Sequence, residues 1–140
     1  MAEVPALLVI FEVKEKFHIF TFLLLYNMQE QVITLIKQLK DNSITFKDVL
    51  EFIDTNYQHQ PTAFKNGDAY NEATQNQGSA RVFAFARINN LNEEDTLHLF
   101  AEHYRSVINN PDGTDHQNIR QFMAHGWKGV VFEGAALLAK

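Results

Sequence analysis

The residues best suited to chemistry gather in one short window, NNPDGTDHQNIRQFMAHGW, from residue 109 to residue 127. The window holds two aspartates, two histidines, an arginine and the only tryptophan of the chain. Histidine and carboxylate side chains can act together as general acid and base, and an arginine can hold an anion. The window is therefore either a reaction centre or the beginning of a well-formed helix.

A structural role explains most of this window. Asp115 is predicted to cap a helix over residues 116–125 by accepting hydrogen bonds from the amides of Gln117 or Asn118. Gly126 is expected to end the helix, because glycine accepts the backbone conformation that follows a last turn. The helical spacing places three residues toward the core, namely Ile119, Phe122 and Met123.

The other residues of the window also have ordinary explanations. His116 would begin the helix in a solvated position, and Arg120, one turn later, could pair with an acid from elsewhere such as Glu72. Trp127 follows the helix end, where a tryptophan usually fills the core. His116 and His125 lie on opposite faces of the helix, and His98 and His103 are five residues apart. Neither spacing suits one metal ion, so we expect no metal.

The amide-rich loop NEATQNQGS, residues 71–79, is the less ordinary feature. Its side chains can both donate and accept hydrogen bonds, which suits recognition of a polar ligand. If a ligand site exists, we expect it where this loop meets the helix start, holding a small anion with backbone amides and Arg120. The candidate ligand-binding residues are Asn71, Glu72, Asn76, Asp115, His116, Arg120 and Trp127.

An enzymatic alternative uses the same region. A small hydrolase could employ His116 with Asp115 or Glu72, provided that these groups lie within hydrogen-bonding reach in one pocket. Ser79 with His116 and an aspartate, Asp112 or Asp115, can be assembled as a triad, but Ser79 lacks the G-x-S-x-G turn of a nucleophile elbow. The chain has no Walker loop and no dinucleotide-binding fingerprint, so we expect no cofactor.

Composition narrows the class of protein. A chain of 140 residues is long enough for one domain with one hydrophobic core. Its net charge is −5 and it has no basic run, so neither nucleic acid nor an acidic membrane surface is an expected partner. The absence of cysteine excludes disulfides and thiolate chemistry, and it fits a cytoplasmic protein.

Residues 1–27 form an apolar extension ahead of the domain at 28–140. The charges from Glu12 to Lys16 divide this extension into two runs, each about half the length of a transmembrane helix. Alternation over residues 17–22 could form a strand of an added hairpin. A second hypothesis is that translation begins at Met28, which the intact mass of the native protein would decide.

From residue 28 onward the chain predicts an α+β fold of four to five helices with a small antiparallel sheet. A first helix would bury Val32, Leu35, Ile36 and Leu39. A second would open at Ser43 and stop before Pro61. Ser79 would cap a third over residues 80–88, where a buried strand at 82–85 is the alternative, and Asn92 would cap a fourth over 93–108.

Two short segments are expected to supply the sheet. A hairpin near residues 62–72 would turn at Asn66-Gly67, a pair that readily takes positive φ angles. A last strand would lie near residues 130–133.

Four segments carry a resemblance to a known family: QPTAFKNG, NEATQNQGS, VFAFA and PDGTDHQNIRQFMAHGWKGVVFEG. In this order and spacing, from about residue 29 to the C-terminus, the chain resembles the HopJ family of bacterial proteins. The family is named after a type III secretion effector, so the resemblance implies export through such a system as the alternative to a cytoplasmic location. It implies no catalytic residue, substrate or cofactor. The expected function is a non-enzymatic domain that binds a small ligand or another protein.

Overall fold

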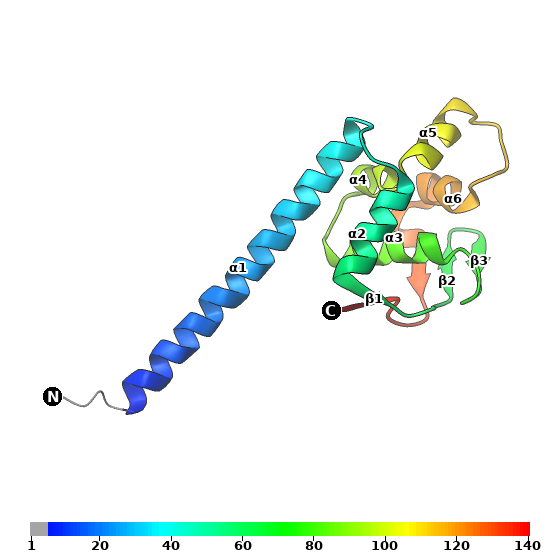
Figure 1. Ribbon diagram of the computed structural model, residues 1–140. Helices are drawn as coiled ribbons and strands as arrows, with labels where there is room; N and C mark the ends of the chain where they lie inside the picture. The colour runs from blue at the N-terminus through cyan, green and yellow to red at the C-terminus, as the bar shows by residue number, and fades with distance from the viewer. Residues whose placement is uncertain (1–5) are drawn as a thin grey trace. The chain divides into compact units, whose positions relative to one another are not determined.

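The computed structural model describes residues 6–140, which form the expected α+β fold (Figure 1). The helices are α1 (Ala6–Lys40), α2 (Phe46–Asn56), α3 (Gln77–Ile88), α4 (Glu93–His98), α5 (Glu102–Asn109), α6 (Gln117–His125) and the 3-10 helix η1 (Gly126–Gly129). The strands are β1 (Tyr57–His59), β2 (Phe64–Asn66), β3 (Ala69–Asn71), β4 (Val130–Phe132) and β5 (Leu137–Ala139).

The chain divides into two compact units, one up to Thr34 and one from Leu35 to Lys140. The first unit is the long N-terminal part of α1, so the strand expected over residues 17–22 is wrong. Glu12 and Lys16 are four residues apart, a spacing at which opposite charges support a helix. The charges therefore interrupt the apolar runs without interrupting the helix.

By length and composition alone, the part of α1 from Glu12 to Lys40 could cross a membrane. It contains an 18-residue window with a mean hydropathy of 1.3. Core helices of soluble proteins and N-terminal signal sequences meet the same two criteria. That this protein does not bind a membrane therefore remains an expectation based on its net negative charge.

The second unit contains two small antiparallel sheets. One has the strand order β3-β2-β4, with Phe64 of β2 opposite Asn71 of β3 and Phe132 of β4. The other pairs β1 with β5. The hairpin and the last strand are confirmed, but only Gly67 of the predicted turn pair has a positive φ angle, because Asn66 is a fully buried strand residue.

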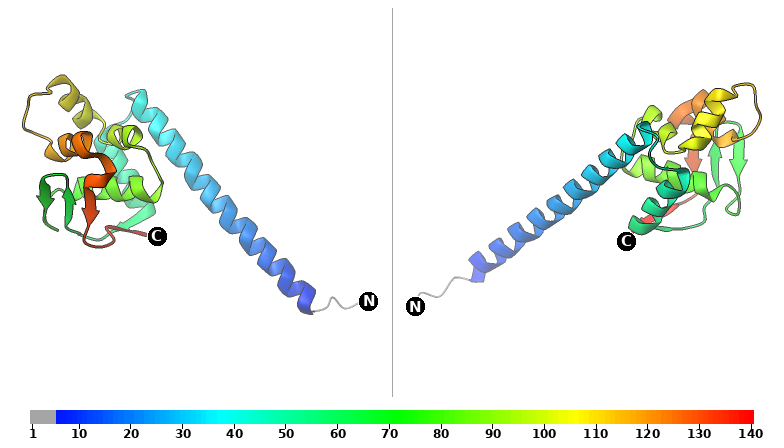
Figure 2. Two further views of the ribbon diagram at one scale, coloured as in Figure 1. Left: turned by 180° about the vertical axis from the view of Figure 1, so that it is seen from behind. Right: turned by 45° about the horizontal axis from the view of Figure 1, so that its top comes forward.

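Helix α3 runs through the middle of this unit, as the views in Figures 1 and 2 show. Its residues 82–86 are all buried, which explains why the segment also looked like a buried strand. Phe83 is the centre of an aromatic cluster, with ring centroids 5.3 Å from Phe100 and 5.0 Å from Phe122. Ile36 and Leu39 are also buried, as predicted.

The helix boundaries differ from the expected ones in three places. The cap of α2 is Thr45 rather than Ser43, and α3 begins after Asn76 rather than at Ser79. The predicted fourth helix is capped by Asn92 as expected, but it is split into α4 and α5. The break lies at Ala101, whose φ of 48° and ψ of −121° are costly for a residue with a Cβ atom.

Candidate functional site

A cavity of about 460 Å³ lies where the starts of α3 and α6 meet the edge strand β3. Among residues 6–140, no aspartate, glutamate, lysine or arginine lines it. The lining residues are Phe46, Ala69, Tyr70, Asn71, Asn76, Gly78, Ser79, Phe100, His103, His116, Gln117, Asn118 and Ile119. The size is within the range of small-molecule sites, and the wall mixes aromatic and amide groups.

Helix α6 opens at the cavity from an unusual cap. His116 is its N-cap residue and has a left-handed conformation, with φ 51° and ψ 49°. Its side chain accepts no hydrogen bond from the first turn. Among the described residues, the amides of Gln117 and Asn118 have no acceptor. The positive end of the helix dipole is therefore available at the cavity wall.

Helix α3 opens at the same cavity in the same way. Its N-cap residue Asn76 is also left-handed, with φ 51° and ψ 39°, and makes no side-chain cap. Within the part of the chain that the structure describes, the amides of Gly78 and Ser79 donate to no acceptor. Two sets of first-turn amides thus converge on one space that contains no fixed anionic group.

Three asparagines brace the two helix starts against each other. Asn76 donates from Nδ2 to Oδ1 of Asn71 over 2.7 Å, and Asn118 donates to the same oxygen over 2.9 Å. Asn71 donates in return to Oδ1 of Asn118 over 3.2 Å. Asn71 and Asn118 are buried, and hydrogen bonds are stronger in the low dielectric of the protein interior. This network therefore holds the cavity wall in place.

Two histidines complete the wall. His103 on α5 and His116 at the start of α6 face each other, with ring centroids 4.9 Å apart and planes inclined by 34°. The ring of Phe46 meets His103 edge-on at 4.9 Å. The side chain of His116 is about one-third exposed, at 32%, so the pair can be reached from solvent.

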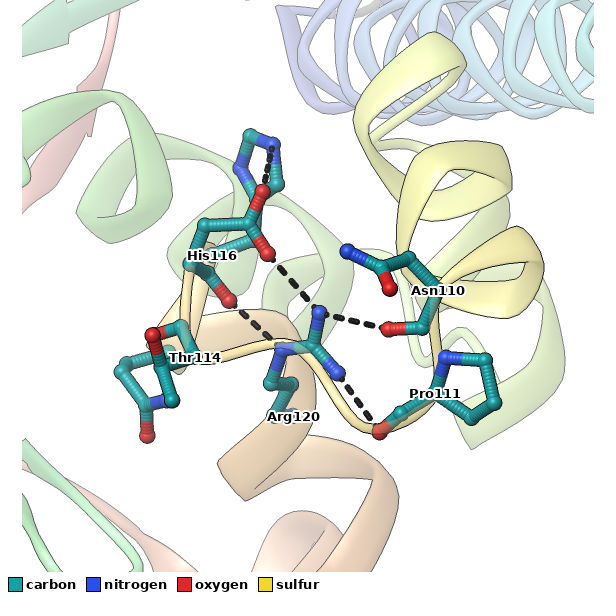
Figure 3. Close-up of polar contacts among 7 residues, drawn as sticks. Asn110, Pro111, Thr114, His116 and Arg120 are labelled. Carbon is teal, nitrogen blue, oxygen red and sulfur yellow. Dashed lines mark hydrogen bonds and ion pairs between the residues drawn. The ribbon is translucent and has the colours of Figure 1, made fainter.

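The predicted capping role of Asp115 is wrong. Among the described residues, its carboxylate accepts no hydrogen bond from the first turn of α6, and it accepts one from Nη2 of Arg120 over 2.8 Å. Figure 3 shows the bonds of the Arg120 guanidinium. The bond from Arg120 is the main cause of the lowered pKa of Asp115, with a smaller contribution from His116. The left-handed His116 turns the chain just before the helix, and Asp115 is thereby carried beyond the reach of the free amides.

Arg120, a predicted ligand residue, does not line the cavity and instead holds the loop before α6. Its guanidinium also donates to the carbonyl oxygens of Asn110, Pro111 and Asp115, and its side chain is only 13% exposed (Figure 3). The predicted pairing with Glu72 is wrong, because these partners all belong to the loop before α6. Every nitrogen of the guanidinium is used to hold that loop.

The remaining predicted site residues separate into two groups. Asn71, Asn76 and His116 line the cavity, whereas Glu72 and Trp127 do not. Trp127 packs edge-on against Phe122 at 5.1 Å, as expected of a residue that fills the core.

The enzymatic grouping is not assembled in this geometry. The Oδ2 atom of Asp115 lies 3.8 Å from Nε2 of His116, longer than a hydrogen bond. Ser79 lies in the cavity wall, and among the described residues its hydroxyl makes no hydrogen bond to a histidine. No group of three potential metal ligands occurs in residues 6–140.

Sequence reasoning missed several residues of the wall. Phe46 begins α2, Phe100 lies between α4 and α5, and His103 is on α5. Only the fold brings them to the start of α6. Asn118 had been considered only for its backbone amide, yet its side chain is part of the asparagine network. Met123, predicted to be buried, is 49% exposed and lines a surface groove with Val107 and Ile108.

Comparisons with known proteins found one family and one similar solved structure. The model of the HopJ type III effector protein family matches residues 29–137. A crystal structure described as that of the unknown function protein VPA0580 is similar, with 42% sequence identity and a TM-score of 0.71. The similarity covers 76% of this chain and 92% of that one. No curated protein matches.

Proposed function

We propose that this chain, which belongs to the HopJ type III effector protein family, is a binding domain for a small anionic ligand that it does not transform. The ligand would occupy the cavity between the starts of α3 and α6. The observation that carries this proposal is the convergence of two helix starts without side-chain caps on one cavity that lacks charged residues. Helix starts of this kind favour anions through both their free amides and their dipoles.

The positions of the acidic groups favour binding over catalysis. The carboxylate of Asp115 is held by Arg120, and Glu72 is not among the described residues of the cavity wall. In the described part of the chain, no carboxylate hydrogen-bonds to His116 to orient it as a general base, as hydrolases of the triad type require. The asparagine network instead holds the wall rigid, as suits a site whose shape is set before the ligand arrives.

A matched pair of substitutions at Ser79 tests this proposal. Ser79 lies in the first turn of α3 and in the cavity wall. Ser79→Asp places a negative charge where the helix dipole favours it, so the free energy of unfolding should stay constant or rise. The same charge should repel an anion in the cavity. Ser79→Asn is similar in size and uncharged, and should keep anion binding.

The measurement is isothermal titration calorimetry with sodium sulfate, with sodium chloride at equal ionic strength as the reference. The proposal predicts sulfate binding by the natural chain and by Ser79→Asn, and its loss in a fully folded Ser79→Asp. Equal binding by the two variants would place any sulfate site outside this cavity and contradict the proposal.

A further inference from the structure

The histidine pair in the cavity wall has unused hydrogen-bonding capacity. Within the described part of the chain, no ring nitrogen of His103 or His116 makes a hydrogen bond. Among the described residues, none of these nitrogens is buried without a partner, so they are open to solvent and to a ligand. Here both rings contribute to the wall of a cavity that opens to solvent.

The acids near the pair already have other partners. Asp115, nearest to His116, accepts from Arg120 over 2.8 Å. Glu102, the neighbour of His103 on α5, accepts from the amide of Phe46 through both carboxylate oxygens, over 2.9 Å and 3.2 Å. In the part of the chain that the structure describes, neither carboxylate makes a hydrogen bond to a ring nitrogen of the pair.

The other elements at the cavity bring no further charge. Tyr70 on β3 is the other titratable residue of the wall, and its hydroxyl donates to Glu133 over 2.9 Å. The bond to Glu133 raises the pKa of Tyr70, which keeps the phenol neutral. α2 and α3 contribute no charged side chain to the wall. The two imidazoles are therefore the groups that can supply positive charge to this cavity.

We propose that the cavity binds an oxyanion group such as sulfate or phosphate together with a proton taken up by the His103–His116 pair. This rests on the proposed function and names its ligand class and its regulation. Two imidazolium rings with centroids 4.9 Å apart repel each other, so a second proton is disfavoured in the empty cavity. A bound dianion offsets that repulsion, so anion binding and proton uptake favour each other.

The remaining wall indicates what the oxyanion is attached to. Phe46 and Phe100 stack at a centroid distance of 5.8 Å and form an apolar part of the cavity beside the histidines. A free oxyanion would leave this part unfilled. A phosphate ester with a flat apolar group would cover it, so we expect phenyl phosphate to bind more tightly than inorganic phosphate at the same pH.

The test is calorimetric titration of the full chain with sulfate, whose charge is constant between pH 5.5 and 8. Histidine ordinarily loses its proton near pH 6.5. Above that pH the dissociation constant should rise by up to about tenfold per pH unit for each proton taken up. Titrations in two buffers of different ionisation enthalpy should give different heats. The difference equals the number of protons taken up multiplied by the difference between the two ionisation enthalpies.

The matched variants are His103→Gln with His116→Asn, and His98→Gln as the control. Asparagine tolerates the left-handed conformation at position 116. The double variant should bind sulfate more weakly at pH 6 and without pH dependence. His98 stacks on Tyr104 and is not among the lining residues, so its variant should bind as the natural chain does.

The outcomes separate this inference from the proposed function. Sulfate binding that is independent of pH and buffer in the natural chain would overturn the inference and leave the proposed function standing. No sulfate binding at any pH would overturn both. If the double variant does not fold, the pH and buffer dependence of the natural chain decides the matter alone. Equal affinity for phenyl phosphate and inorganic phosphate would assign the cavity to the free anion.

Discussion

The starts of α2 and α4 differ from the starts of α3 and α6 in how their first amides are occupied. Thr45 accepts a hydrogen bond from the amide of Asp48, and the Asp48 carboxylate accepts one from the amide of Thr45 over 2.8 Å. Asn92 likewise accepts from the amide of Asp95 over 2.8 Å. At α3 and α6 the N-cap residues are left-handed and provide no such bond.

This difference indicates that the starts of α2 and α4 are stabilised by their own side chains, whereas the first amides of α3 and α6 stay free. Side-chain caps satisfy the first amides locally, so the starts of α2 and α4 need no ligand. The starts of α3 and α6 are held instead by asparagine bonds from the side, which leave the amides facing the cavity. The start of α5 also lacks a side-chain cap, and it follows the left-handed Ala101.

The largest expected effect comes from removing the brace that replaces the caps. Asn71→Ala would leave the Nδ2 groups of Asn76 and of the buried Asn118 without their shared acceptor. The free energy of unfolding should fall by about 2–3 kcal/mol. Urea unfolding measures this, with Asn109→Ala on the exposed end of α5 as the control. A loss no larger than that of the control would mean that the brace is not needed.

Removing a side-chain cap should cost less. Thr45→Ala abolishes the acceptor for the Asp48 amide and half of the capping box. We expect a loss of about 1 kcal/mol in the free energy of unfolding. The exposed Thr74 offers a Thr→Ala control outside a helix start. If both changes cost the same in urea unfolding, the distinction between the two kinds of helix start loses its energetic basis.

A glycine at position 101, just before α5, should stabilise the third helix start without a side-chain cap. Ala101 has φ 48° and ψ −121°, a region that glycine enters without steric cost. Ala101→Gly should therefore raise the free energy of unfolding by about 1 kcal/mol, after the entropic cost of glycine is subtracted. A lowered unfolding midpoint would show that the conformation at Ala101 is not strained.

A change at an open helix start should alter stability least. His116→Asn keeps a residue that tolerates the left-handed region and removes no side-chain cap. The free energy of unfolding should change by less than about 0.5 kcal/mol, as for an ordinary surface substitution. A loss as large as that of Thr45→Ala would make His116 a structural residue.

The Asp115–Arg120 pair, next to the cavity, should make stability slightly dependent on pH. The pKa of Asp115 lies below its ordinary value of 3.8, chiefly because of the bond from Arg120. A carboxylate with a lowered pKa adds stability above its unfolded pKa and loses it as the pH falls through the folded pKa. Acid unfolding of Asp115→Asn should thus depend less on pH below about 4 than that of the natural chain. Identical acid curves would contradict this.

The fold was largely predictable, because hydrophobic spacing and turn residues act locally. Asn92 was correctly identified as a cap, and Gly126 ends α6 with φ 63° as expected. Asp115 and Ser79 have the composition of caps but do not act as caps, because a left-handed residue shifts the start of each helix. Asn and His are enriched in the left-handed region, but most residues of both types adopt other conformations, so the sequence does not single out Asn76 and His116.

The cavity was predictable only in part. Its place at the junction of the amide-rich loop and the helix start follows from the sequence, and Asn71, Asn76 and His116 lie there. His103 and Phe100 reach it only because the chain turns sharply at Ala101, a non-glycine residue in a glycine conformation. No local pattern predicts such a break within a continuous helical periodicity.

The most direct test of the central claim compares the two kinds of helix start in one experiment. Sulfate is titrated into the isotope-labelled chain at pH 6, and the backbone amide resonances are followed by two-dimensional NMR. The account predicts that the amides of Gly78, Ser79, Gln117 and Asn118 shift together with one dissociation constant, while those of Asp48 and Asp95 do not. Shifts that are absent at the cavity, or that are equal at the capped and uncapped helix starts, would contradict it.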